Sequence, residues 1–149
     1  MSNLAGRYGL VVFLSGIAVG ILVTLAEYLL NRPLYNAGMA LIPVMAGAMD
    51  AGQRQYRLGG AVPAGAEGWR AARLMTGALA VVSMVQLAIF WALGGLQEIM
   101  QVVPVSGLVA MLLAILLLAC PLNRVFFMMG ARNAAKAAER QTHQRIRTD

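Results

Sequence analysis

The fold of this chain is decided by residues 36–93, where a polar, arginine-containing segment separates two apolar runs. Residues 36–52 read NAGMALIPVMAGAMDAG, residues 53–73 read QRQYRLGGAVPAGAEGWRAAR, and residues 74–93 read LMTGALAVVSMVQLAIFWAL. A helix rises about 1.5 Å per residue, so roughly 20 apolar residues match the hydrocarbon core of a bilayer. The pattern predicts two membrane-spanning helices joined by a loop that stays on one side of the membrane.

The composition of the whole chain also indicates a protein that is surrounded by the lipid bilayer. Its 149 residues are 60% hydrophobic and 12% charged, whereas soluble domains are about 45–50% apolar and about 25% charged. A length of this size leaves room for one domain. The net charge is +6, but the basic residues lie between and after the apolar runs, as membrane topology requires. We therefore expect the lipid bilayer to be the main partner and expect no nucleic-acid binding.

Working outward from this stretch, we predict an all-α membrane protein, a bundle of four transmembrane helices. The spans are expected at about 8–30, 34–52, 71–93 and 104–127, with a loop over residues 53–70. They form a transmembrane domain over residues 1–129, followed by a basic tail at 130–149. The first span is expected to be uncleaved, because its apolar run is longer than the core of a signal peptide. The tail is either a frayed helix near anionic headgroups or a solvated segment that only sets topology.

The distribution of basic residues predicts the orientation. With four spans both termini lie on one side, and eleven of the twelve basic residues fall there, in the N-terminus, the 53–73 segment and the region from Arg124 to the end of the tail. Only Arg32 falls on the other side. The positive-inside rule then predicts a multi-pass protein of the bacterial cytoplasmic (inner) membrane with both termini in the cytoplasm.

Small residues predict where the helices approach one another. Gly16 and Gly20 form a G-x-x-x-G pair in the first span, and Gly47 and Ala51 repeat the spacing in the second. Such residues let helix backbones pack closely in membranes. We expect these positions, together with Gly77 in the third span, to form the helix contacts.

Three polar residues within the spans are candidates for function. Glu27 lies near the outer end of span one, where it can act in transport, or reach the interface and meet Arg32. Asp50 lies near the inner end of span two, and Arg54, four residues on, is expected to offset its charge. Gln86 lies near the centre of span three, where amides usually hydrogen-bond between helices. The structural interpretation is favoured for all three.

Residue types that carry chemistry are scarce. His143 is the only histidine and lies in the tail, which argues against a bis-histidine haem site. Cys120 is the only cysteine, so it can form no internal disulfide and no thiolate metal site by itself. Residues 59–65, GGAVPAG, lack the lysine of a phosphate-binding loop. We therefore expect no enzyme activity, no catalytic residues, no cofactor and no metal.

The segment after span two resembles the ABZJ-type family of small four-span bacterial inner-membrane proteins. The family pattern closes its second span with an A-x-x-x-G-Q-like motif and continues with a short basic loop containing Gly, Pro and Glu. The matching residues here are Ala48, Gly52, Gln53, Gly60, Pro63, Glu67 and Trp69, and residues 27–30, EYLL, are similar to the family's close of span one. The resemblance implies a four-span fold, and because the family has no established activity, it implies no catalytic residue.

Three functional hypotheses follow. The first is a non-enzymatic accessory or scaffold subunit that binds another membrane protein or itself. The second is a small multidrug-type transporter protomer that uses Glu27, although the charge bias opposes the inverted dual insertion that such dimers use. The third is a holin-like pore, suggested by small size and a basic tail.

Overall fold

The computed structural model describes residues 2–33, 39, 41–94, 100 and 103–148 of the chain. Within them, the ordered elements are four helices: α1 (Ser2–Leu30), α2 (Leu41–Gly59), α3 (Gly65–Ala92) and α5 (Val105–Thr148). The prediction of an all-α protein is confirmed. Three of these helices, α1, α3 and α5, are long and apolar enough to cross a membrane.

The second predicted span, residues 34–52, differs from the structure. Residues 34–38 and 40 lie outside the described part of the chain, and α2 begins at Leu41. It does not end at residue 52 but continues to Gly59, so the loop predicted from residue 53 is wrong at its start. Polar residues such as Gln53 and Arg54 are good helix formers, and polarity alone does not end a helix. The helix ends where Gly60 takes a left-handed φ of +67°.

The third helix also begins earlier than the predicted span at 71–93. It starts at Gly65, because the Glu67 carboxylate accepts a hydrogen bond from the backbone N–H of Ala64 at 3.1 Å, as in a capping box. The connection between α2 and α3 is therefore only residues 60–64. Both helices project their polar ends toward this short turn.

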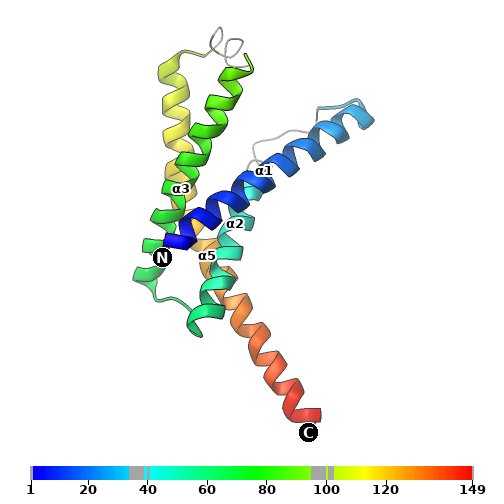
Figure 1. Cartoon of the computed structure of the whole chain (residues 1–149), viewed down its shortest axis with the longest axis vertical. Coiled ribbons are helices and arrows are strands. Elements are labelled where there is room, and N and C mark those ends of the chain that lie inside the picture. Colours follow the sequence, from blue (N-terminus) through cyan, green and yellow to red (C-terminus); the bar gives the residue numbers. More distant parts are fainter. Residues whose placement is uncertain (1, 34–38, 40, 95–99, 101–102, 149) are drawn as a thin grey trace.

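The last helix runs through the predicted boundary at residue 129. α5 has 44 residues, which corresponds to about 66 Å, roughly twice the thickness of the hydrocarbon core. Pro121 lies inside it without ending it. The tail is thus a helical continuation of the last apolar helix, at the lower end of Figure 1.

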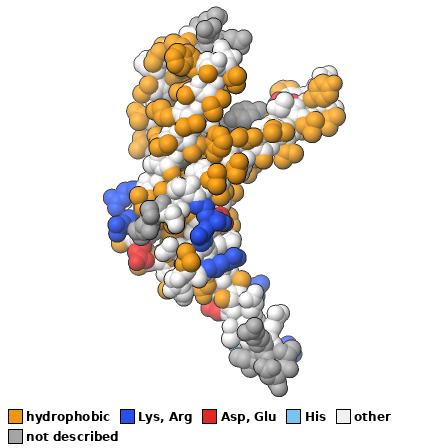
Figure 2. All heavy atoms as spheres, viewed as in Figure 1, with side chains coloured by type: hydrophobic (Ala, Val, Ile, Leu, Met, Phe, Trp, Pro, Cys, Tyr) orange, Lys and Arg blue, Asp and Glu red, His pale blue; other side chains and the backbone are white. Residues whose placement is uncertain are grey.

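The helices form two diverging arms (Figure 1). One arm is α1, and the other is α3 paired with the first part of α5, residues 105–120. The arms meet where α1 begins and where α2 crosses α5. On the face seen in Figure 2, hydrophobic side chains cover both arms, and basic side chains (Lys and Arg) gather where the arms join and below. Buried residues make up only 6% of the most apolar stretch of α1, 11% in α3 and 6% in α5.

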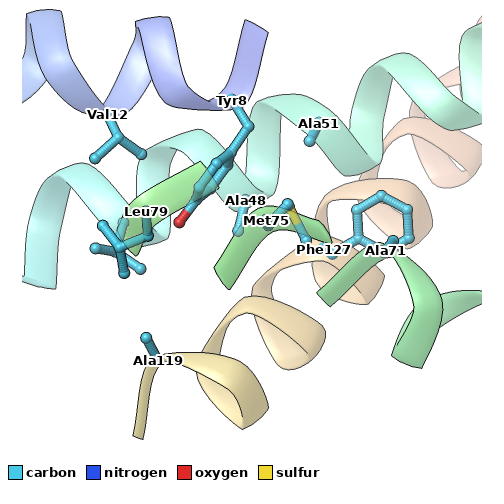
Figure 3. Close-up of a cluster of buried hydrophobic side chains, with 10 residues drawn as sticks. Tyr8, Val12, Ala48, Ala51, Ala71, Met75, Leu79, Ala119 and Phe127 are labelled. Atoms are coloured by element: carbon cyan, nitrogen blue, oxygen red, sulfur yellow. The ribbon is translucent and has the colours of Figure 1, made fainter. Parts of the chain in front are cut away.

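The core lies at this meeting point and contains residues from all four helices (Figure 3). Tyr8 and Val12 of α1 pack among buried side chains of α2, α3 and α5. The other buried members are Val44, Ala48, Ala51, Ala71, Met75, Leu79, Ala119 and Phe127. Most of the core is therefore built from alanine and a few large side chains, which brings the helix axes close together.

Two glycines make the crossing of α2 and α5 possible. A Cβ placed on Gly52 would overlap the carbonyl oxygen of Phe127, and a Cβ placed on Gly130 would overlap that of Met49. Each helix thus contributes one glycine against the backbone of the other. Close backbone approach through glycine is the usual packing device of membrane helices.

Candidate functional site: a polar junction of four helices

Polar side chains from all four helices gather at the base of the two arms. We call this set the polar junction, and it consists of Arg7, Tyr8, Asp50, Trp69, Thr76, Asn123 and Arg124. It combines a buried hydrogen-bond chain, one ion pair and one cation–π contact.

The buried chain joins α1, α5 and α3. The Tyr8 hydroxyl donates to Oδ1 of Asn123 at 2.9 Å, and Nδ2 of Asn123 donates to Oγ1 of Thr76 at 3.2 Å. Asn123 is 0% exposed and Tyr8 is 1% exposed. Buried polar groups must be paired, because an unpaired one costs about 1–3 kcal/mol. The three residues satisfy one another and so fix the relative positions of three helices.

The ion pair joins α1 to α2. Nε of Arg7 lies 3.0 Å from Oδ2 of Asp50, and Nη2 of Arg7 lies 3.4 Å from Oδ1. The expected partner of Asp50 was Arg54, four residues along the same helix, but the structure pairs it with Arg7 of another helix. The side chains of Arg7 and Asp50 are 48% and 38% exposed, so water and salt screen the pair.

The cation–π contact joins α5 to α3. The guanidinium of Arg124 lies 4.5 Å from the ring centroid of Trp69. The Nε atom of Arg124 is buried and has no hydrogen-bond partner among the described residues. The aromatic face therefore replaces water for this part of the guanidinium group.

A pocket of about 300 Å³ opens beside the ion pair. It lies between the first two turns of α1 and the polar half of α2. Its lining residues are Asn3, Leu4, Arg7, Tyr8, Asp50, Ala51, Arg54, Gln55 and Leu58. Arg54, expected to neutralise Asp50, instead faces this pocket together with the pair.

The other two polar candidates lie away from the junction. Glu27 is in the last turn of α1, at the far end of the first arm from the junction. Gln86 lies on the α3 arm, and its Nε2 atom is 3.5 Å from a Cβ placed on Gly16. The structure therefore brings only Asp50 of the three into the junction.

The predicted packing glycines divide into two groups. Gly16 faces Gln86 of α3, and a Cβ on Gly47 would lie 2.9 Å from Cγ2 of Val12. Ala51 is buried in the core. At Gly20 and Gly77, no described atom lies within 4 Å of an added Cβ, so the contacts expected there are not made within the described part of the chain.

Sequence reasoning missed the buried chain. Asn123 follows an apolar run and directly precedes Arg124, and Tyr8 directly follows Arg7, so both looked like ordinary residues at helix ends. The available signal was position: each is a hydrogen-bonding side chain at the polar end of an apolar run. Nothing in that pattern indicates that the two residues meet.

The polar groups of the junction pair with one another across helices. Asparagine and threonine do not titrate, so neither can take a proton from the Tyr8 hydroxyl. Among the described residues, no group of three His, Cys, Asp or Glu side chains could hold a metal ion.

The sequence matches no family model, and neither a curated protein nor a solved structure matches the chain.

Proposed function

We propose that this chain is a small integral membrane protein without a catalytic role, an accessory or scaffold subunit of a bacterial inner-membrane assembly. The observation that carries the proposal is the divergence of the two apolar arms. The helices contact one another at one end, and within the described part of the chain their apolar lengths are mostly exposed.

The polar groups support the same proposal. Those that the structure gathers are paired with one another across helices, in the hydrogen-bond chain, the ion pair and the cation–π contact. Side chains used in this way hold helices in register. A site that reacts with a substrate instead needs polar groups directed at the substrate.

The proposed topology has the four spans expected from the sequence, with both termini in the cytoplasm. Its support is the charge distribution, since eleven basic residues would lie on one side and only Arg32 on the other. The ends labelled N and C in Figure 1 also lie on the same side of the arms. Membership of the ABZJ-type family remains part of this proposal, on the motif residues named above.

Site-specific photocrosslinking in cells tests the proposal. A photoreactive residue at Leu22 on the α1 arm, or at Leu117 on the α5 arm, should give a crosslinked protein of one defined mass. These side chains are 64% and 75% exposed in the isolated chain. The same residue at Gln141 in the tail serves as the control. A chain that crosslinks only to lipid from both arms, and purifies as a monomer in mild detergent, would count against a subunit role.

A further inference from the structure

The pocket beside Arg7 carries an inference beyond the proposed function. It is a cavity of about 300 Å³ whose lining contains both charged and apolar side chains. Arg7, Asp50 and Arg54 supply the charges, and Leu4 and Leu58 supply apolar surface. Asn3 and Gln55 add side-chain amides that can donate or accept hydrogen bonds.

The charges in this pocket do not cancel. Asp50 accepts hydrogen bonds from Nε and Nη2 of Arg7, which neutralises that arginine but uses only two of its five N–H donors. Among the described residues, no carboxylate pairs with Arg54. The two arginines and one aspartate give the lining a net charge of +1. The first turn of α1, with its positive dipole end, adds to the attraction for an anion.

The pocket lies beside the start of the apolar length of α1. Arg7 precedes the apolar length of α1, and the first strongly exposed apolar side chain beyond it, Leu10, follows within one helical turn. When α1 crosses the bilayer, the pocket is therefore at the interface, next to hydrocarbon.

We infer that this pocket binds the headgroup of an anionic phospholipid, a phosphodiester that carries one negative charge and free hydroxyl groups, as in phosphatidylglycerol. Arg54 and the remaining donors of Arg7 bind the phosphate oxygens, because guanidinium groups match phosphate geometry. Asn3 and Gln55 bind the hydroxyl groups, and Asp50 holds Arg7 in place. The inference rests on the membrane location proposed above, and it adds a specific lipid to that proposal.

Native mass spectrometry of the full chain in detergent, titrated with phosphatidylglycerol or phosphatidylcholine of the same acyl chains, tests the inference. The wild-type chain should bind phosphatidylglycerol more tightly. Arg54→Gln should weaken that binding about tenfold, the effect of losing one charge-assisted hydrogen bond. Arg57→Gln is the matched control: it makes the same charge change on the same helix, but Arg57 lines a different groove, against the α5 tail.

If Arg54→Gln and Arg57→Gln weaken phosphatidylglycerol binding equally, or if the wild-type chain prefers neither lipid, the pocket is not a specific lipid site. The basic surface would then attract anionic lipid only diffusely. If millimolar inorganic phosphate displaces phosphatidylglycerol, the pocket binds free phosphate, and the proposal of a lipid site is wrong. An alkaline wash of membranes that contain the chain tests the membrane location separately from the lipid-binding pocket. Release of the chain would refute the membrane location itself, whereas retention with equal binding by both variants would refute only the pocket.

Discussion

The hydroxyl of Tyr8 donates a hydrogen bond to Oδ1 of Asn123 across 2.9 Å, although the two residues are 115 positions apart in the sequence. This bond joins the start of α1 to the middle of α5 and, through Thr76, to α3. It lies where the two arms meet, so the directions in which the arms leave the core depend on it. Among the described residues, the side-chain hydrogen bonds, the ion pair and the cation–π contact that join different helices are concentrated at one end of the apolar helices.

Replacing Asn123 should destabilise the protein more than replacing any exposed polar residue of α5. In Asn123→Ala, the buried hydroxyl of Tyr8 and the partly buried hydroxyl of Thr76 lose their common partner. We expect a loss of about 1–3 kcal/mol in the free energy of unfolding, measured by thermal or denaturant unfolding in detergent. Asn133→Ala, an exposed asparagine on the same helix, should change the stability little. Equal stability of the two variants would show that the buried chain does not stabilise the junction.

Glycine-to-alanine substitutions at two positions should change the stability of the protein in opposite directions. In Gly52→Ala the new Cβ meets the backbone of Phe127, so α2 and α5 must separate, at a cost of about 1–3 kcal/mol. In Gly77→Ala, within α3, no described atom lies near the new Cβ. Alanine is the better helix former by about 0.5–1 kcal/mol, so this variant should be slightly more stable. The melting temperatures of the two variants, measured in the same detergent, should fall on either side of the wild-type value.

A melting temperature for Gly52→Ala at or above that of the wild type would contradict the close crossing of α2 and α5. Gly130→Ala provides an independent check of the same crossing, because its Cβ would meet the backbone of Met49 from the other helix.

Arg124 should alter the fluorescence of Trp69. In a Trp91→Phe background, Trp69 is the only tryptophan, and Arg124→Gln removes the cation from its face. We expect emission at longer wavelength, because the uncovered ring meets more water, and a loss of about 0.5–1 kcal/mol in stability. Arg132→Gln, an exposed arginine two turns further along α5, should leave the emission unchanged. A spectrum unaffected by Arg124→Gln would place the guanidinium away from the ring.

Cysteine labelling in intact cells should show on which side of the membrane the turn between α2 and α3 and the far end of α1 lie. In a Cys120→Ala background, Ala61→Cys lies in the short turn after α2, and Tyr28→Cys lies at the far end of α1. A membrane-impermeant maleimide should label position 28 in intact cells and position 61 only after permeabilisation, because the arginine-rich side stays in the cytoplasm. Labelling of position 61 from outside would reverse the proposed orientation.

Much of the helical content follows from local patterns. Long apolar runs predict helices at residues 8–30, 71–93 and 104–127, and α1, α3 and α5 cover nearly all of those positions. Their ends are less predictable: α2 extends past Gly52 and α3 starts before residue 71, because polar residues continue a helix as readily as apolar ones. The packing glycines show the same limit. Gly47 and Gly52 meet another helix, whereas the equally plausible Gly20 and Gly77 meet no described atom.

The amino-acid sequence alone determined that these helices are apolar and long enough for a bilayer, because hydrocarbon requires backbone groups to be bonded within each segment over about 20 residues. It also determined which ends of the helices carry arginine. Only the tertiary structure decided that Asp50 pairs with Arg7 rather than Arg54, and that Tyr8 and Asn123 meet in the core. Such pairings depend on how helices cross, and glycine and alanine positions allow several crossings with similar local sequence.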